Sequence, residues 1–252
     1  MLNRRQLLSL LAGGLSAAAI AASDRATAFD FISPDTPTLE DFASTTLTDL
    51  EAQVRVVSAD QTELGKINRD FGMAYRLRNL TMRYKEPNKL RMEGSIGCLI
   101  VNGPLRHFKV PALKLSKKDD LGNSPGKRYS LMDVGLLTRT SLAGTQGRYL
   151  KDEKVGDILA KVFEITYKGD ESVRYQIWID PHTHVIAKRE WQDAMGKRKA
   201  TFLYQEPKQV GTDLWVPTRI EIRNAEGVVA AVTSYSEVKV NQGLDDSLFQ
   251  IA

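Results

Sequence analysis

The sequence predicts a mainly β protein of the α+β class, in which one curved antiparallel sheet of about ten to eleven strands forms an unclosed β-barrel. Apolar residues alternate with polar ones at a period of two from Phe71 onward, and turn-forming residues recur at regular intervals after Gly147. The sequence contains no Gly-rich dinucleotide loop, no P-loop and no alternation of strands with helices. An N-terminal helix and a short inserted helical lid complete the predicted architecture. The length of the chain, without a second type of fold pattern, predicts a single domain.

Composition and charge exclude several classes of protein. Of the 252 residues, 42% are hydrophobic and 26% charged, which rules out a disordered chain, a collagen-like chain and a disulfide scaffold. The formal net charge of +4 falls to +2 once residues 1–28 are set aside, because that segment holds three arginines and one aspartate. No block of five like charges occurs in the sequence. The small excess of basic residues therefore does not indicate a nucleic-acid-binding surface.

Residues 1–28 have the three-part pattern of a secretory signal peptide. Arg4 and Arg5 form a basic start, Leu7 to Ala22 is apolar, and Ala26-Thr27-Ala28 is an A-x-A cleavage site. The paired arginines are similar to a twin-arginine signal, so the export route stays open, as does the alternative of an uncleaved anchor. No cysteine follows the cleavage site directly, and no second apolar span occurs. We therefore expect residues 29–252 to be one soluble, monomeric periplasmic domain.

The first expected element of this domain is a helix from Leu39 to about Ile67. Thr38 is suited to cap its start, with Asp41 three residues further on. Apolar residues step by three or four along the segment, at Leu39, Ala43, Leu47, Leu50, Val54 and Val57.

A first run of strands is expected from Phe71 to Val110. The alternation of apolar residues slips by one position near Asn79, which indicates a β-bulge. Glu86-Pro87-Asn88 indicates a turn, and Asn102-Gly103 is the strongest hairpin signal in the sequence. The expected strands cover 71–84, 89–94, 97–101 and 105–110.

A polar connection and a second run of strands complete the predicted order. Pro111 to Arg128 is rich in Lys, Asp, Gly and Ser, which indicates a loop. A helix is expected over Leu131–Leu142, with Ser130 and Asp133 as its capping box. Gly, Pro, Asn and Asp then mark the turns between seven further strands. These strands are expected at 148–154, 157–168, 172–180, 185–192, 198–206, 214–223 and 228–240.

No combination of residues in the sequence supports catalysis. His182 and His184 form an H-x-H pair, but residues 180–183 are typical of a hairpin turn and no clear third ligand is present. Cys98 lies in an apolar run and is expected to be a buried small hydrophobe rather than a nucleophile. There is no G-x-S-x-G motif. We therefore expect a protein that is not an enzyme, with no catalytic residue, no metal and no cofactor.

The shape of the predicted sheet indicates a binding function instead. A curved sheet has a concave face, which two amphipathic helices would cover. The covered space is either filled as ordinary core or left as a lidded apolar cavity for an acyl chain, whose shelter from water is worth about 0.8 kcal/mol per CH₂. The residues expected to line such a cavity are Tyr84, Leu90, Met92, Ile100, Leu131, Val134, Leu137, Phe163, Ile177 and Ile179.

Several segments resemble the LolA/LolB-like superfamily of periplasmic lipoprotein carriers and sorting proteins. Tyr84 to Glu93 is similar to its Y-x-x-P-x-x-[FL]-R-x-E segment, and residues 124–137 are similar to a related LolA-like group. The C-terminal half is similar to the outer membrane lipoprotein-sorting branch. Its matching segments are Trp178-Ile179-Asp180-Pro181, Leu214 to Ile220, Tyr235 to Asn241 and Asp246 to Phe249.

The resemblance implies an unclosed β-barrel with a helical lid over an apolar cavity that binds acyl chains of lipids or lipoproteins. This sequence differs from the family pattern at one position. A basic residue directly before the proline helps to hold the lid in typical carriers, whereas this chain has Glu86. Three functions are open at this point: a carrier for transport or sorting towards the outer membrane, a LolA-like envelope sensor that binds lipid and an inner- or outer-membrane protein, and a metal-dependent enzyme built on His182 and His184.

Overall fold

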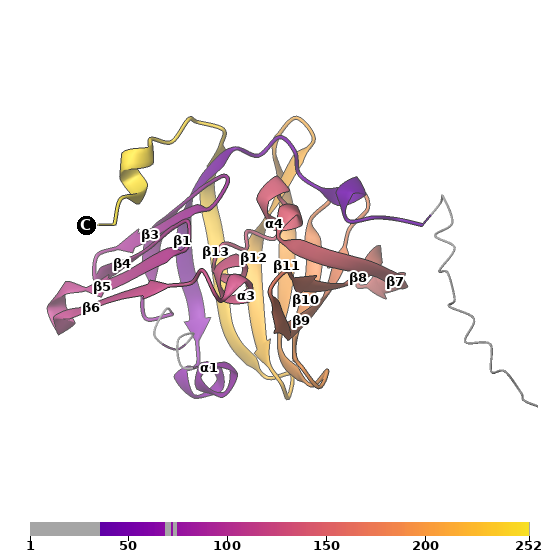
Figure 1. Ribbon diagram of the computed structural model, residues 1–252, viewed down its shortest axis with the longest axis horizontal. Coiled ribbons are helices and arrows are strands. Elements are labelled where there is room, and N and C mark those ends of the chain that lie inside the picture. The colour runs from indigo at the N-terminus through magenta and orange to yellow at the C-terminus, as the bar shows by residue number, and fades with distance from the viewer. Residues whose placement is uncertain (1–35, 69–71, 73–74, 252) are drawn as a thin grey trace, which may run out of the picture. The chain divides into compact units, whose positions relative to one another are not determined.

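A computed structural model describes residues 36–68, 72 and 75–251, which belong to one compact unit beginning at Thr36 (Figure 1). The predicted signal peptide over residues 1–28 lies outside the described residues and stays a prediction. Within the part of the chain that the structure describes, no helix is long and apolar enough to cross a membrane.

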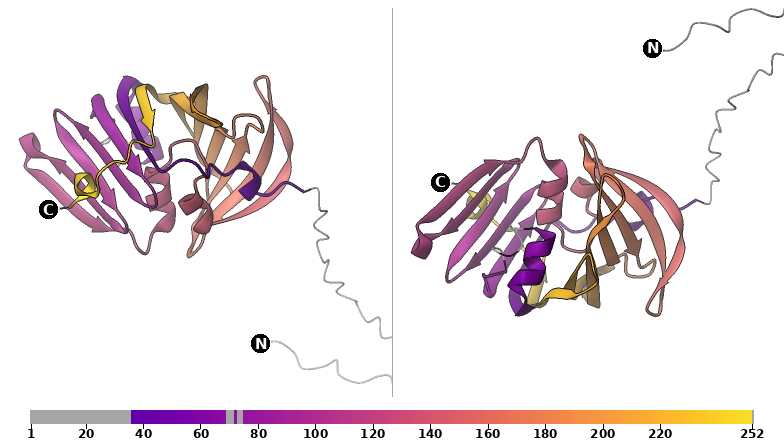
Figure 2. Two further views of the ribbon diagram at one scale, coloured as in Figure 1. Left: turned by 90° about the horizontal axis from the view of Figure 1, so that it is seen from above. Right: turned by 90° about the horizontal axis from the view of Figure 1, so that it is seen from below.

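Thirteen strands of the described chain form one antiparallel sheet, in the order β6-β5-β4-β3-β2-β1-β13-β12-β11-β10-β9-β8-β7. The first and last strands of the described residues pair at the centre of the sheet. Its two edges are β6 and β7, which follow one another in sequence. Figure 2 shows how the sheet curves between these edges. The prediction of an unclosed, curved antiparallel sheet is confirmed, but the described residues form thirteen strands rather than ten to eleven, because the strands at Asp49–Ala59 and Leu115–Asp120 were not predicted. The strands are β1 (Asp49–Ala59), β2 (Asn79–Lys85), β3 (Lys89–Gly94), β4 (Gly97–Asn102), β5 (Leu105–Val110), β6 (Leu115–Asp120), β7 (Thr145–Val155), β8 (Ile158–Tyr167), β9 (Asp170–Ile179), β10 (Ile186–Asp193), β11 (Arg198–Gly211), β12 (Leu214–Asn224) and β13 (Val229–Val240).

The seven strands predicted after Gly147 are confirmed, and their ends differ from the prediction by a few residues. Turn residues between the strands explain this success, together with alternation in strands such as β12, where Ile220 and Ile222 are buried and Glu221 and Arg223 are half-buried. In β2, Leu80, Met82 and Tyr84 are buried while the residues between them are half-buried. Buried residues from both halves of the sheet form one hydrophobic core on the concave face.

The prediction of one helix from Leu39 to Ile67 is wrong. The segment instead forms a single 3₁₀ turn η1, a long strand β1 and a short helix α1, in the order η1 (Glu40–Phe42), β1 (Asp49–Ala59) and α1 (Gln61–Ile67). The buried residues of β1, Leu50, Ala52 and Val54, follow the period of two that is typical of a strand. Strand β1 is favoured because it pairs with β13 on one side and β2 on the other. The helix that does form is capped by Asp60, whose carboxylate accepts from the N–H groups of Thr62 and Glu63.

The first run of strands also differs from the prediction. Tyr75 and Arg76 lie in a turn and β2 begins only at Asn79, so the bulge predicted there is a strand start. The predicted residues Phe71 and Met73 lie outside the described residues. The expected loop from Pro111 contains the 3₁₀ turn η2 (Pro111–Leu113) and β6. Strand β6 was missed because it is a polar, largely exposed edge strand.

The connection from β6 to β7 holds two short helices rather than one. They are α3 (Pro125–Leu131) and α4 (Arg139–Ala143). Between them the chain is held by backbone hydrogen bonds to other segments: Ile186 N–H donates to Gly135 O at 2.9 Å, and Ser44 N–H donates to Leu137 O at 2.7 Å. Gly135, with φ at +78°, takes the chain out of the helical conformation. The capping box lies at Thr138 and Ser141 instead of Ser130 and Asp133.

The C-terminal turn η3 (Asp246–Phe249) packs against β3 and β4 on the face opposite the concave core. Phe249 is fully buried there, and Arg91 donates a 2.8 Å hydrogen bond to Leu248 O. Asp246 bridges the ammonium groups of Lys85 and Lys89, each at 2.7 Å. These contacts fix the end of the described chain to the first half of the sheet.

This bridge predicts a pH-dependent contribution to stability. Hydrogen bonds from Lys85 and Lys89 lower the pKa of Asp246 from 3.8 to about 2. Because the folded state prefers the carboxylate, the contribution is present above about pH 4 and is lost as the pH falls towards 2. We expect Asp246→Asn to lower the Tm slightly at pH 7, and the difference from wild type to shrink in thermal melts between about pH 4 and 2. A difference that stays constant across this range would contradict the assignment.

Candidate functional site

The concave face of the sheet is covered by the chain between its two edge strands. We call residues 121–144, which include α3 and α4, the lid segment. Figure 1 shows both helices in front of the middle of the sheet, and α3 contacts β8 and β9. Because the lid segment joins β6 to β7, it spans the opening that would otherwise separate the two edges of the sheet.

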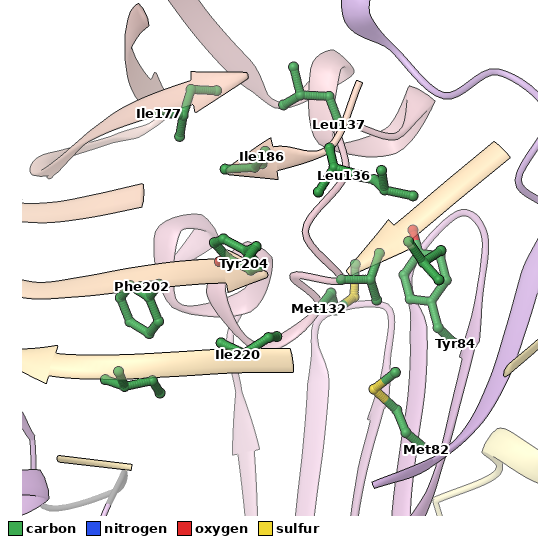
Figure 3. Packing of buried hydrophobic residues seen from close by; sticks show 14 of the residues in the cluster. Met82, Tyr84, Met132, Leu136, Leu137, Ile177, Ile186, Phe202, Tyr204 and Ile220 are labelled. Carbon is green, nitrogen blue, oxygen red and sulfur yellow. The ribbon is translucent and has the colours of Figure 1, made fainter. Parts of the chain in front are cut away.

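Apolar side chains of the lid segment fill the concave face. Met132, Leu136 and Leu137 are 4–6% exposed and belong to the main hydrophobic core. In Figure 3 they lie between Tyr84 of β2 on one side and Ile186 of β10 on the other. The lid segment therefore supplies part of the core that joins the two halves of the sheet.

Aromatic rings extend this packing around α3. Tyr129 of α3 stacks on Tyr167 of β8 with 4.9 Å between ring centroids and 15° between planes. Tyr167 in turn meets the edge of Tyr175 of β9 at 5.7 Å. A Cβ atom at Gly144 would lie 2.0 Å from the Tyr129 hydroxyl oxygen, so this arrangement requires glycine at the end of α4.

A small cavity lies under the lid segment, between it and both halves of the sheet. Its volume is about 40 Å³, with walls that include Tyr84 of β2, Leu137 of the lid segment and Ile177 of β9. Such a space is large enough for ordered water. An acyl chain does not fit this closed arrangement, so a ligand of that size requires the side chains of the lid segment to move out.

The structure brings most of the residues predicted to line a cavity together. Nine of the ten lie in the concave core or pack against it: Tyr84, Leu90, Met92, Leu131, Val134, Leu137, Phe163, Ile177 and Ile179. Ile100 is placed differently. It neighbours Val101, which is in the concave core, so alternation directs Ile100 to the other face of β4, where η3 packs. Whether the nine contact a ligand stays a prediction.

A buried ion pair lies at the same cavity, and the sequence analysis did not predict it. Arg189 of β10 is 4% exposed, and its Nη1 atom lies 2.6 Å from Oδ2 of Asp133 in the lid segment. The same carboxylate accepts hydrogen bonds from the Tyr204 hydroxyl and, at 2.8 Å, from Gly135 N–H. One feature of the sequence could have indicated this pair. Arg189 and Trp191 lie two residues apart and so share one face of β10, which places a charged side chain at an inward-facing position.

The electrostatics around the cavity keep Arg189 charged. Burial alone would lower the pKa of Arg189, but the carboxylate of Asp133 and the surrounding tyrosines raise it above its usual value. Burial also raises the pKa of Tyr204 well above its usual value. The guanidinium therefore stays protonated, and Tyr204 stays a neutral hydrogen-bond donor.

Glu86, in the β2–β3 turn, ties the lid segment to the sheet. Its carboxylate accepts hydrogen bonds from the hydroxyl groups of Tyr84 and of Thr140 in α4. Burial and the nearby carboxylate raise the pKa of Tyr84, so this hydroxyl stays protonated and donates. An acidic residue thus contacts the lid segment at the position where the resemblance implies a basic one.

Replacing Glu86 with alanine is expected to loosen α4. Two hydrogen bonds to a half-buried carboxylate are lost, which predicts a fall of about 1–2 kcal/mol in the free energy of unfolding. Amide hydrogen exchange should accelerate selectively over Arg139–Ala143. Thr140→Val removes only one of the two hydrogen bonds and should give a smaller change at the same amides. Unchanged exchange over α4 in Glu86→Ala would contradict the role of Glu86.

The residues considered for metal chemistry are placed in a turn. The carboxylate of Asp180 accepts from His182 N–H at 2.9 Å and from the Thr183 hydroxyl at 2.7 Å, and His184 N–H donates to Asp180 O. Among the described residues, no three His, Cys, Asp or Glu side chains gather as metal ligands would. Cys98 is half-buried rather than buried.

A curved, open antiparallel sheet whose concave face is covered by a lid segment is the LolA/LolB-like fold, and solved structures share it. One is a protein domain of Vibrio parahaemolyticus named for outer membrane lipoprotein sorting, with a TM-score of 0.61, 14% identity and coverage of 84% of this chain and 93% of the other. A LolA superfamily protein of Nitrosomonas europaea gives 0.54 and 17%, covering 84% and 94%. A DUF1329 family protein of Desulfovibrio piger gives 0.51 and 13%, covering 84% and 92%.

The C-terminal part of the chain also matches a family model. Residues 113–252, more than half of the chain, match the family described as "-like: Uncharacterized protein", and the chain belongs to this family. A comparison with the curated proteins finds no match.

Proposed function

We propose that this chain is a periplasmic carrier that holds the acyl chain of a lipid or lipoprotein on the concave face of its sheet, in the place that the lid segment fills in this structure. One observation carries the proposal: Met132, Leu136 and Leu137 of the lid segment, rather than the sheet alone, fill the concave face. An acyl chain can take their place when the lid segment moves. The LolA-like fold and the predicted signal peptide support the proposal.

The apolar contributions to this exchange are similar in size. Exposing the three lid side chains costs roughly 5–9 kcal/mol, at about 1.5–3 kcal/mol for each buried aliphatic side chain. Burying a chain of about twelve CH₂ groups gains roughly 10 kcal/mol. A carrier of this kind needs no catalytic group, because binding consists of the exchange of one apolar surface for another.

Mass spectrometry of bound lipid tests the proposal. Protein purified under native conditions from a host with membranes should carry extractable lipid, and delipidated protein should take up a fluorescent fatty acid. Leu137→Ala weakens the packing of the lid segment and should raise the affinity for that probe, whereas Leu159→Ala, at a residue 54% exposed on β8, should not.

The outcomes separate the proposal from its alternatives. Ligand-free protein that takes up no fatty acid would contradict the carrier function. Capture of one membrane protein, independent of bound lipid, would indicate the envelope sensor instead.

A further inference from the structure

The ion pair under the lid segment joins two parts of the molecule that the proposed function requires to separate. Arg189 belongs to the sheet, where its guanidinium carbon lies 5.0 Å from the ring centre of Tyr175 and 4.5 Å from that of Phe202. Asp133 belongs to the lid segment. When the lid segment moves away, its carboxylate leaves with it, and the guanidinium stays behind on the concave face.

Two donors of the sheet converge on one oxygen of that carboxylate. Oδ2 of Asp133 accepts from Nη1 of Arg189 and from the hydroxyl of Tyr204. Nε of Arg189 is buried and has no hydrogen-bond partner in the described structure, so this side chain has donor capacity that Asp133 does not use. Both Arg189 and Asp133 line the 40 Å³ cavity, which places the donors beside the space under the lid segment.

A buried guanidinium without an anion is strongly unfavourable. In the closed structure the lid segment keeps water from Arg189, and in a loaded state an acyl chain on the concave face would do the same. In both states the guanidinium therefore needs an anion beside it. In the closed structure Asp133 supplies it. In the open, loaded state the ligand is the remaining source, provided that its head group is an acid.

We propose that Arg189 and Tyr204 form a receptor for the carboxylate of a fatty acid, and that Asp133 occupies this receptor while the lid segment is closed. The proposal rests on the proposed function and names its ligand class: a single-chain amphiphile with a carboxylate head. The ligand and the lid segment compete for the same two donors, so loading and lid closure exclude one another.

Binding of dodecanoic acid and of dodecanol, measured by displacement of a fluorescent fatty acid from delipidated full-length protein, tests this assignment. Wild type should bind the acid roughly tenfold to a hundredfold more tightly than the alcohol, since a hydrogen bond to a charged group is at stake. Asp133→Asn frees the receptor and should raise the affinity for the acid more than that for the alcohol. Lys188→Gln, which removes a neighbouring charge paired with Glu190, should keep the wild-type preference.

The double variant Asp133→Asn/Arg189→Met keeps the test decisive if a single variant does not fold, because it leaves no unpaired charge under the lid segment. It should lose the preference for the acid. Equal preference in wild type and in the double variant would overturn the receptor and show that the ion pair serves structure only. Binding of both probes without preference would overturn the receptor but leave the carrier function standing, whereas binding of neither would overturn both.

Discussion

Replacing Arg189 with methionine is expected to lower the free energy of unfolding by about 3–5 kcal/mol, the usual cost of leaving one partner of a buried ion pair without the other. Asp133 would keep its hydrogen bonds from Tyr204 and Gly135 but lose the cation that offsets its desolvation. Urea denaturation with a linear extrapolation measures the change.

A matched control variant distinguishes the effect of losing a buried charge from that of losing an exposed one. Arg223→Met removes a guanidinium that pairs with Glu221 at 2.6 Å but whose side chain is 41% exposed, so its cost should stay below about 1 kcal/mol. The double variant Asp133→Asn/Arg189→Met should recover part of the stability that Arg189→Met loses. A loss in Arg189→Met no larger than in Arg223→Met would contradict the account of a buried pair.

Gly135→Ala is expected to destabilise the closed lid segment by roughly 2–5 kcal/mol, because strain and overlap add. Gly135 has φ at +78°, and a Cβ atom there would lie 2.6 Å from Cγ of Pro217 and 2.9 Å from Cδ1 of Tyr204. Neither ring can move aside cheaply. The variant should unfold at lower urea concentration and take up fatty acid faster than wild type.

Gly169→Ala isolates the part of this effect that comes from the backbone. Gly169 also has φ at +78°, but a Cβ atom there would meet nothing within 4 Å. Its cost should stay at roughly 1–2 kcal/mol, with no change in uptake. Equal losses in the two variants would show that Gly135 does not hold the lid segment against Pro217 and Tyr204.

Local patterns predicted the sheet where turn residues and alternating side chains mark the strands. They failed where pairing with segments distant in the sequence decides the structure. The turn signals and alternation after Gly147 indicated all of β7 to β13. By contrast, Val54 fits a helical spacing and a strand spacing equally well, and only the pairing of β1 with β13, about 180 residues further along the chain, selects the strand. Strand β6 is polar on both faces, so it carries no hydrophobic period to detect.

In the candidate site, too, some features could be predicted from local patterns and others could not. The sequence indicated the apolar residues of the concave face because inward positions repeat along each strand. It could not indicate that Arg189 meets Asp133, since that contact depends on how residues 132–138 leave the helical path between α3 and α4. The direction of Ile100 likewise depends on the register of β4 against β3, which pairs Val101 with Leu90.

The central claim, that a ligand enters when the lid segment moves off the concave face, is tested most directly by a reversible cross-link. Leu136 and Val185 face one another in an antiparallel bridge of the non-hydrogen-bonded kind, as the bond from Ile186 N–H to Gly135 O shows. Pairs of this kind have Cα atoms about 4.5 Å apart, within the range of a disulfide. Leu136→Cys/Val185→Cys, made with Cys98→Ser so that no other thiol remains, tethers the lid segment to the β9–β10 hairpin.

Uptake of a fluorescent fatty acid is then compared in the oxidised and the reduced protein, with Cys98→Ser alone as the control for the reductant. The account predicts no uptake while the cross-link is intact and, once it is reduced, uptake at least at the level of the control. Equal uptake by the oxidised and reduced forms would contradict it.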